Sequence, residues 1–109
     1  MQIESPEAVA NADAIAAIDG VDVLFIGPSD LSHSMGAFGQ FDRPEFVEAI
    51  RRTADAARAH GKHAGLLLPS PGDYARYYEV GYRFIASGSD AVLLNNAARA
   101  LVNGIRKNA

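Results

Sequence analysis

The fold is decided by the stretch Gly20-Val21-Asp22-Val23-Leu24-Phe25-Ile26-Gly27-Pro28-Ser29-Asp30. Residues 21–26 are apolar apart from Asp22, as expected for a strand of a parallel sheet whose faces are both covered. Glycine and proline then end the strand, and Asp30 follows within the next segment. Ligands of parallel α/β proteins bind at the carboxyl ends of the strands, so Asp30 lies where a binding site is expected.

At the start of the chain, too, an acidic residue stands at the end of a predicted strand. Residues 2–4 form a short predicted strand ending in Glu4, and Ser5-Pro6 is typical of a helix start. Two carboxylates at the ends of two strands form a candidate site for Mg²⁺ or Mn²⁺, because hard cations prefer oxygen ligands. Simpler interpretations stay open: Glu4 can favour the positive end of the following helix, and Asp30 or Ser29 can be an N-cap.

The rest of the sequence repeats the alternation of strand and helix. Further strands are predicted at 63–68 and 83–87, helices at 5–20, 42–60, 70–81 and from 89 or 90 to the tail 107–109, and the longest loop at 27–41. This alternation indicates a parallel α/β sheet with right-handed crossovers. It allows a small doubly wound sheet or half of an eight-stranded barrel. The half-barrel is favoured, because the chain begins directly in a core strand.

Three local features of the helices are also predicted. Asp42 with Glu45 resembles a capping box at the start of the second long helix. The helix at 70–81 is expected to bury Tyr74, Tyr77 and Tyr78. The last helix is expected to begin at a cap formed by Ser89 or Asp90, and its apolar residues are Val92, Leu93, Ala97, Leu101 and Ile105.

Composition excludes several classes of function. The 109 residues are 49% hydrophobic and 21% charged, which is typical of one globular domain, and the net charge of −3 without a basic block argues against nucleic acid as a partner. There is no cysteine, so a disulfide framework, a thiolate nucleophile and a cysteine zinc site are excluded. No apolar run reaches the ~18 residues of a membrane span, and no secretory signal pattern is present. A cytoplasmic location is therefore expected.

Two motifs together resemble the HpcH/HpaI aldolase family, metal-dependent class II pyruvate aldolases related to the citrate lyase β subunit. They are Gln2-Ile3-Glu4-Ser5-Pro6 and Gly27-Pro28-Ser29-Asp30-Leu31-Ser32. Leu66-Leu67 and residues 81–90 are similar to the last two strands of the family. The resemblance covers nearly the whole chain. It implies that residues 1–109 are the C-terminal half of a (β/α)₈ TIM barrel, strands five to eight.

The resemblance also implies a set of site residues. Glu4 and Asp30 would bind a divalent metal, Mg²⁺, Mn²⁺ or Co²⁺, which chelates pyruvate. The backbone amides of Ser29 and Asp30 would receive the pyruvate carboxylate. The substrate-binding residues would be Gln2, Gly27, Pro28, Ser29, Asp30 and Leu67. The catalytic arginine and the histidine base of the family lie in the first half of the barrel, so no residue here inherits those roles, and His33, His60 and His63 are not assigned to them.

The resulting expectation is a lyase that reversibly cleaves a 4-hydroxy-2-oxo acid into pyruvate and an aldehyde, present here as a fragment with the metal site. By resemblance, the last helix would pack on another subunit of a homo-oligomer. The alternative is a non-catalytic α/β module that binds a small carboxylate or phosphate.

Overall fold

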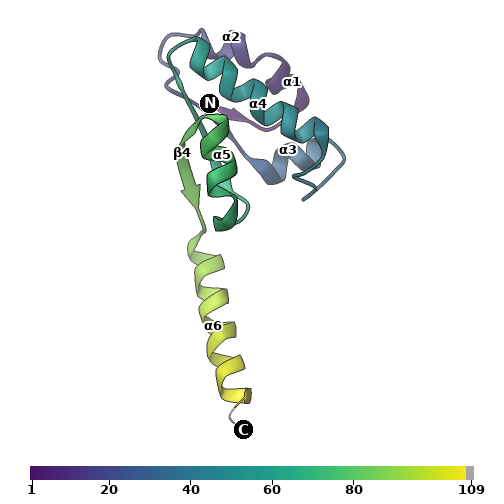
Figure 1. Cartoon of the computed structure of the whole chain (residues 1–109), viewed down its shortest axis with the longest axis vertical. Helices are drawn as coiled ribbons and strands as arrows, with labels where there is room; N and C mark the ends of the chain where they lie inside the picture. Colours follow the sequence, from purple (N-terminus) through teal and green to yellow (C-terminus); the bar gives the residue numbers. More distant parts are fainter. Residues whose placement is uncertain (108–109) are drawn as a thin grey trace.

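A computed structural model describes residues 1–107 (Figure 1). Four parallel strands form one sheet in the order β1 (Gln2–Ile3), β2 (Val23–Ile26), β3 (His63–Leu68) and β4 (Tyr82–Ser87). Strands that follow one another in sequence are neighbours in the sheet. A doubly wound sheet reverses its strand order at a switch point, whereas a barrel keeps the sequential order. The partial barrel is therefore the architecture observed.

Along the chain, every helix except the last lies between two strands. Some of these helices differ from the sequence prediction. They are α1 (Pro6–Ala10), α2 (Ala12–Ala16), α3 (Pro28–Ser34), α4 (Pro44–Ala59), the 3₁₀ turn η1 (Pro71–Asp73), α5 (Tyr74–Val80) and α6 (Asp90–Lys107). The Ser5 N-cap is confirmed, because its hydroxyl accepts the Ala8 N–H at 3.1 Å. The single helix predicted at 5–20 is two short helices that meet at Asn11.

Two local predictions between residues 27 and 45 are wrong. The segment predicted as a long loop contains α3. The predicted capping box is absent, because α4 begins after Arg43, which makes no side-chain cap hydrogen bond. Asp42 instead accepts a hydrogen bond from Arg76 at 2.6 Å. That ion pair joins the segment before α4 to α5, a contact that local sequence does not reveal.

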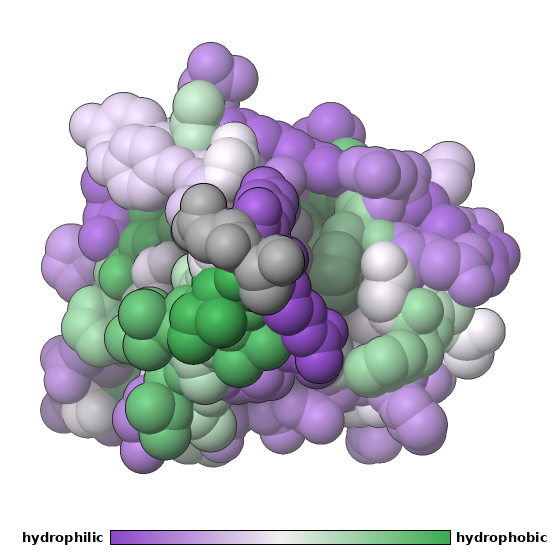
Figure 2. All heavy atoms as spheres, turned by 90° about the horizontal axis from the view of Figure 1, so that it is seen from below, coloured by the Kyte–Doolittle hydropathy of each residue, from purple (hydrophilic) through white to green (hydrophobic). Residues whose placement is uncertain are grey.

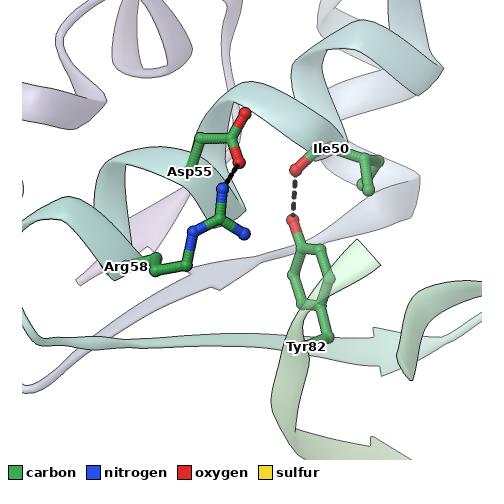
Figure 3. A network of polar contacts seen from close by, with 4 residues as sticks. All are labelled: Ile50, Asp55, Arg58 and Tyr82. Atoms are coloured by element: carbon green, nitrogen blue, oxygen red, sulfur yellow. Dashed lines mark hydrogen bonds and ion pairs between the residues drawn. The ribbon is translucent and has the colours of Figure 1, made fainter. Parts of the chain in front are cut away.

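One face of the sheet is sealed by the helices. The strand residues buried on this face are Ile3, Leu24, Ile26, Ala64, Leu66, Leu68 and Tyr82, and Ile85 of β4 is partly buried against them. The hydroxyl of Tyr82 donates to the backbone oxygen of Ile50 in α4 at 3.0 Å, which ties the start of β4 to that helix (Figure 3). Of the three tyrosines predicted to be buried in α5, only Tyr77 is; Tyr74 and Tyr78 are exposed and stack on each other.

The opposite face of the sheet is open. The strand register places Gln2, Phe25, Gly65 and Phe84 in one row across it. Phe84 is 57% exposed and Leu67 is 43% exposed. In a closed barrel this face is the interior, which side chains from all eight strands fill.

Helix α6 extends away from the body of the molecule (Figure 1). Its residues are exposed throughout, so the predicted apolar face does not pack on this sheet. Ser89 caps the helix as predicted, since its hydroxyl accepts the Val92 N–H at 3.3 Å. The end of the predicted tail, Asn108 and Ala109, lies outside the described residues. Within residues 1–107 no helix is long and apolar enough to cross a membrane.

Candidate functional site

Glu4 is placed beside the end of β2 by the pairing of β1 with β2. Ile3 pairs with Ile26, so Glu4 and Gly27 are the next residues along two adjacent parallel strands. The Glu4 side chain is half-buried. Its Oε1 accepts a hydrogen bond of 2.9 Å from Nε2 of Gln2. Gln2 therefore orients the carboxylate, as an outer partner of a ligand would.

Gly27 lies between the two acidic side chains. A Cβ atom at this position would be 2.8 Å from Glu4 Oε1 and 3.3 Å from Asp30 Oδ2. Both carboxylates thus approach the same point, although Glu4 and Asp30 come from different strand ends. The backbone of Gly27 has φ −92°, which other residues adopt readily, so the need for glycine is one of space. The structure brings Gln2, Glu4, Gly27 and Asp30 together.

Helix α3 holds Asp30 in its first turn. Gly27 is the N-cap and Pro28 the first helical residue, while Ser29 and Asp30 follow with exposed side chains. The interpretation of Asp30 or Ser29 as the N-cap is therefore wrong. First-turn amides lack a partner within their own helix, so the Ser29 and Asp30 N–H groups are donors at this edge of the sheet. A carboxylate in the first turn also interacts favourably with the helix dipole.

The other predicted binding residues line a pocket next to the acidic pair. It has a volume of about 360 Å³. Pro28 and Ser29 form one wall of it and Leu67 of β3 forms part of another. Further lining residues are Phe41, residues 68, 69 and 71 after Leu67, and the end of β4 with the start of α6, among them Ser87 and Leu93. The pocket thus extends from the first turn of α3 to the base of α6.

The residues present fit a divalent cation. Glu4 and Asp30 supply carboxylate oxygens, which Mg²⁺ and Mn²⁺ prefer, and two protein ligands leave coordination positions for substrate and water. Within residues 1–107 no group of three or more His, Cys, Asp or Glu side chains is gathered as a metal cluster. The acidic pair beside Gly27 therefore supplies two protein ligands and not a larger cluster.

His33 and His60 contact residues other than Glu4 and Asp30. The ring of His33 packs edge-on against Phe38 with centroids 6.0 Å apart, and His60 contacts Asp13 of α2 at 2.9 Å. His63 is exposed at the opposite end of β3 from Leu67.

The sequence analysis gave no role to Ser32, whose buried hydroxyl in α3 donates to the backbone oxygen of Ser29. Its serine-rich surroundings give no signal that separates it from Ser29 or Ser34.

A sequential parallel sheet of four strands linked by helices defines a partial (β/α)₈ barrel. A sequence model of the HpcH/HpaI aldolase/citrate lyase family matches residues 1–97, and the chain belongs to this family. The resemblance of the sequence motifs is thereby confirmed.

Relatives and solved structures agree with this assignment. The chain is 45% identical over 107 residues to 5-keto-4-deoxy-D-glucarate aldolase of Enterobacter sp. (strain 638), covering 98% of this chain and 42% of the relative. It is 53% identical over 100 residues to hydroxypyruvate/pyruvate aldolase of Delftia acidovorans, covering 92% and 37%. A crystal structure of an HpcH/HpaI aldolase/citrate lyase family protein from Burkholderia cenocepacia J2315 matches with TM-score 0.88 and 34% identity, covering 96% of this chain and 41% of that one. The chain thus spans about two-fifths of these proteins.

Proposed function

We propose that this chain is the metal- and pyruvate-binding part, strands five to eight, of an aldolase. The complete enzyme reversibly cleaves a 4-hydroxy-2-oxo acid into pyruvate and an aldehyde. The observation that carries the proposal is the approach of Glu4 and Asp30 to one point beside Gly27. The names of the two relatives above, both aldolases, support the reaction class.

Each residue of the site has a role in this proposal. Glu4 and Asp30 hold the cation, and Gln2 fixes the Glu4 carboxylate through its 2.9 Å hydrogen bond. A divalent cation bound there supplies Lewis-acid stabilisation of the negative charge that develops on the keto oxygen during carbon–carbon cleavage. The Ser29 and Asp30 amides receive the substrate carboxylate. Pro28 and Leu67 form apolar walls that exclude water from the three-carbon unit.

The remaining catalytic groups are expected in another part of the enzyme. Cleavage needs a general base for the substrate hydroxyl and a positive group near the developing charge. By the resemblance to the family, the arginine and the histidine would belong to the first half of the barrel, and we assign these roles to no residue of this chain. The chain spans 37–42% of the two relatives, so turnover is expected only when that other part is present.

We also propose that α6 joins this chain to another subunit. Leu94, Leu101 and Ile105 are 72%, 71% and 70% exposed and follow one another at helical spacing. Viewed from below in Figure 2, hydrophobic side chains gather on one side of the C-terminal end and hydrophilic ones on the other. Replacing Leu101 and Ile105 by glutamate should lower the oligomeric state. Light scattering measures this, and a wild-type chain that is monomeric at micromolar concentration would refute the interface.

The metal site is tested by titrating the chain with Mn²⁺ and following water-proton relaxation, with and without pyruvate. Saturable binding that pyruvate enhances is expected. Glu4→Gln and Asp30→Asn should each abolish it, because each removes one of two anionic ligands. The matched controls Glu7→Gln and Asp22→Asn change exposed carboxylates elsewhere and should bind as the wild type does.

Two other results have distinct meanings. A chain that is folded by circular dichroism and binds no Mn²⁺ would overturn the two-carboxylate site. Pyruvate or phosphate binding that is indifferent to Mn²⁺ and to both site variants would favour the non-catalytic binding module instead.

A further inference from the structure

The hydroxyl of Ser32 is buried in the helix that carries Asp30. The residue is 1% exposed and lies in α3, two positions after Asp30. Its Oγ donates to the backbone oxygen of Ser29 at 3.0 Å and accepts the N–H of Gly39 at 3.1 Å. The first bond reaches back within α3, as serine hydroxyls commonly do in helices, and the second reaches forward to the segment that follows the helix.

The bond to Ser29 acts on the peptide group that carries the Asp30 amide. The oxygen of Ser29 and the N–H of Asp30 belong to one planar unit, so a hydrogen bond that fixes the oxygen also fixes the direction of the N–H. The orientation of this peptide plane also affects the direction in which the Asp30 side chain leaves the backbone. Ser32 thereby controls the orientation of a proposed metal ligand and of a proposed carboxylate-binding amide.

The bond to Gly39 anchors this arrangement to a second segment. The backbone oxygen of Ser32 also accepts the Ala37 N–H at 2.9 Å, so side chain and backbone of one residue hold residues 37–39. The far end of that segment is held by Arg76 of α5, which donates to the backbone oxygen of Phe41 at 3.1 Å. The first turn of α3 is thus connected by hydrogen bonds to α5.

The part of α3 that follows Asp30 borders free space. A cavity of about 130 Å³ adjoins Ser32 and is lined also by Met35, Ala37 and Phe46. A helix end that borders free space can shift unless directional bonds hold it. The two bonds of the Ser32 hydroxyl provide that restraint.

We propose that Ser32 is a positioning residue that sets the geometry of Asp30 for metal and carboxylate binding. The inference rests on the proposed metal site. Such outer partners of metal ligands typically change metal affinity by about 10- to 100-fold when they are removed. Ser32→Ala is therefore expected to weaken Mn²⁺ binding by that factor, while Ser32→Thr, which keeps the hydroxyl and has the cavity for its methyl group, retains most of it.

Thr53 provides the matched control. It is also fully buried in a helix, and its hydroxyl donates to the backbone oxygen of Ala49 at 2.9 Å, but it lies in α4 away from the acidic pair. Thr53→Ala removes a buried hydroxyl of the same kind and should bind Mn²⁺ as the wild type does. Equal losses in Ser32→Ala and Thr53→Ala would show a general effect on stability and would overturn the proposal.

Amide hydrogen exchange in the metal-free chain separates this inference from the metal site itself. Ser32→Ala should raise exchange at the Gly39 amide and at the Leu31 amide, whose bond to the Gly27 oxygen closes the first turn of α3, and leave α4 unchanged. Should wild type bind no Mn²⁺, the metal site fails, and unchanged exchange at these two amides would overturn the positioning role independently. Ser32→Cys, which keeps the volume with a weak donor, replaces Ser32→Ala if that variant is unfolded, and it is expected to show a smaller change of the same sign.

Discussion

The two faces of the sheet differ in how well the rest of residues 1–107 covers them. On the face toward the helices, the buried strand residues Leu24, Ile26 and Leu66 are 0% exposed. On the other face, Leu67 and Phe84 remain 43% and 57% exposed. Parallel sheets are normally covered on both sides, and a barrel covers its inner side with its own remaining strands. The outer layer of the partial barrel is thus formed over β1 to β3 and the start of β4, while its interior needs further strands.

The acidic site opens on the incomplete side. Gln2 stands in the same row as Phe25 and Phe84, and Glu4 follows on the same strand and the same side. A carboxylate pair that faces the barrel interior binds a cation more strongly when that interior excludes water, because ionic interactions are stronger at low dielectric. Metal affinity and the state of the open face are therefore expected to be linked.

The largest expected effect separates two adjacent leucines of β3. Leu66 and Leu67 have the same side chain and point to opposite faces, with 0% and 43% exposure. Leu66→Ala should lower the free energy of unfolding by about 2–5 kcal/mol, because it creates a cavity in the sealed layer. Leu67→Ala should lower it by under about 1 kcal/mol, since a half-exposed side chain contributes less burial. Guanidinium unfolding followed by circular dichroism measures both.

The same two variants can also contradict the difference between the two faces of the sheet. Equal losses for the two variants would mean that the open face is already covered in solution, for example by a second copy of the chain. The same measurement in a longer chain that includes the remaining strands should bring the Leu67→Ala loss toward that of Leu66→Ala.

Local sequence was sufficient for the strands and the acidic pair. The run 21–26 is apolar apart from Asp22 and the run 63–68 is apolar after His63, both end at clear turn residues, and each predicted acid follows a strand. Parallel strands bring their carboxyl ends to one edge of the sheet, so the strand pattern alone was enough to place Glu4 near Asp30.

The errors arise where distant contacts decide the outcome. Asp42 resembled a helix cap, yet its partner is Arg76, which lies in another helix. Residues 28–34 contain three serines and no periodic apolar face, so the short helix there has few local signals besides its Gly27-Pro28 start, and the bond between Ser32 and Gly39 forms only beyond its end. In α5 the three tyrosines looked equivalent, but only Tyr77 contacts Tyr82 of the sealed face.

The smallest effect concerns Tyr82 on the sealed face. Burial raises the pKa of its hydroxyl above the ordinary value near 10, and the neighbouring Tyr77 raises the pKa further. The folded chain therefore keeps this proton at alkaline pH when the unfolded chain has released it. The stability contributed by the neutral hydroxyl is complete below pH ~10 and falls as the pH rises beyond it, by about 1.4 kcal/mol per pH unit.

Tyr82→Phe should remove this slope. At pH 7 the variant should be less stable by about 1 kcal/mol, because the hydrogen bond to the Ile50 oxygen is lost. Its disadvantage should shrink above pH ~10 and reverse near pH ~11, since phenylalanine has no proton to release. Tyr74→Phe, which alters an exposed tyrosine, should follow the wild-type curve throughout. Parallel curves for wild type and Tyr82→Phe between pH 9 and 11 would show that this hydroxyl reaches water, and that the helix-covered face is less completely sealed than its buried side chains indicate.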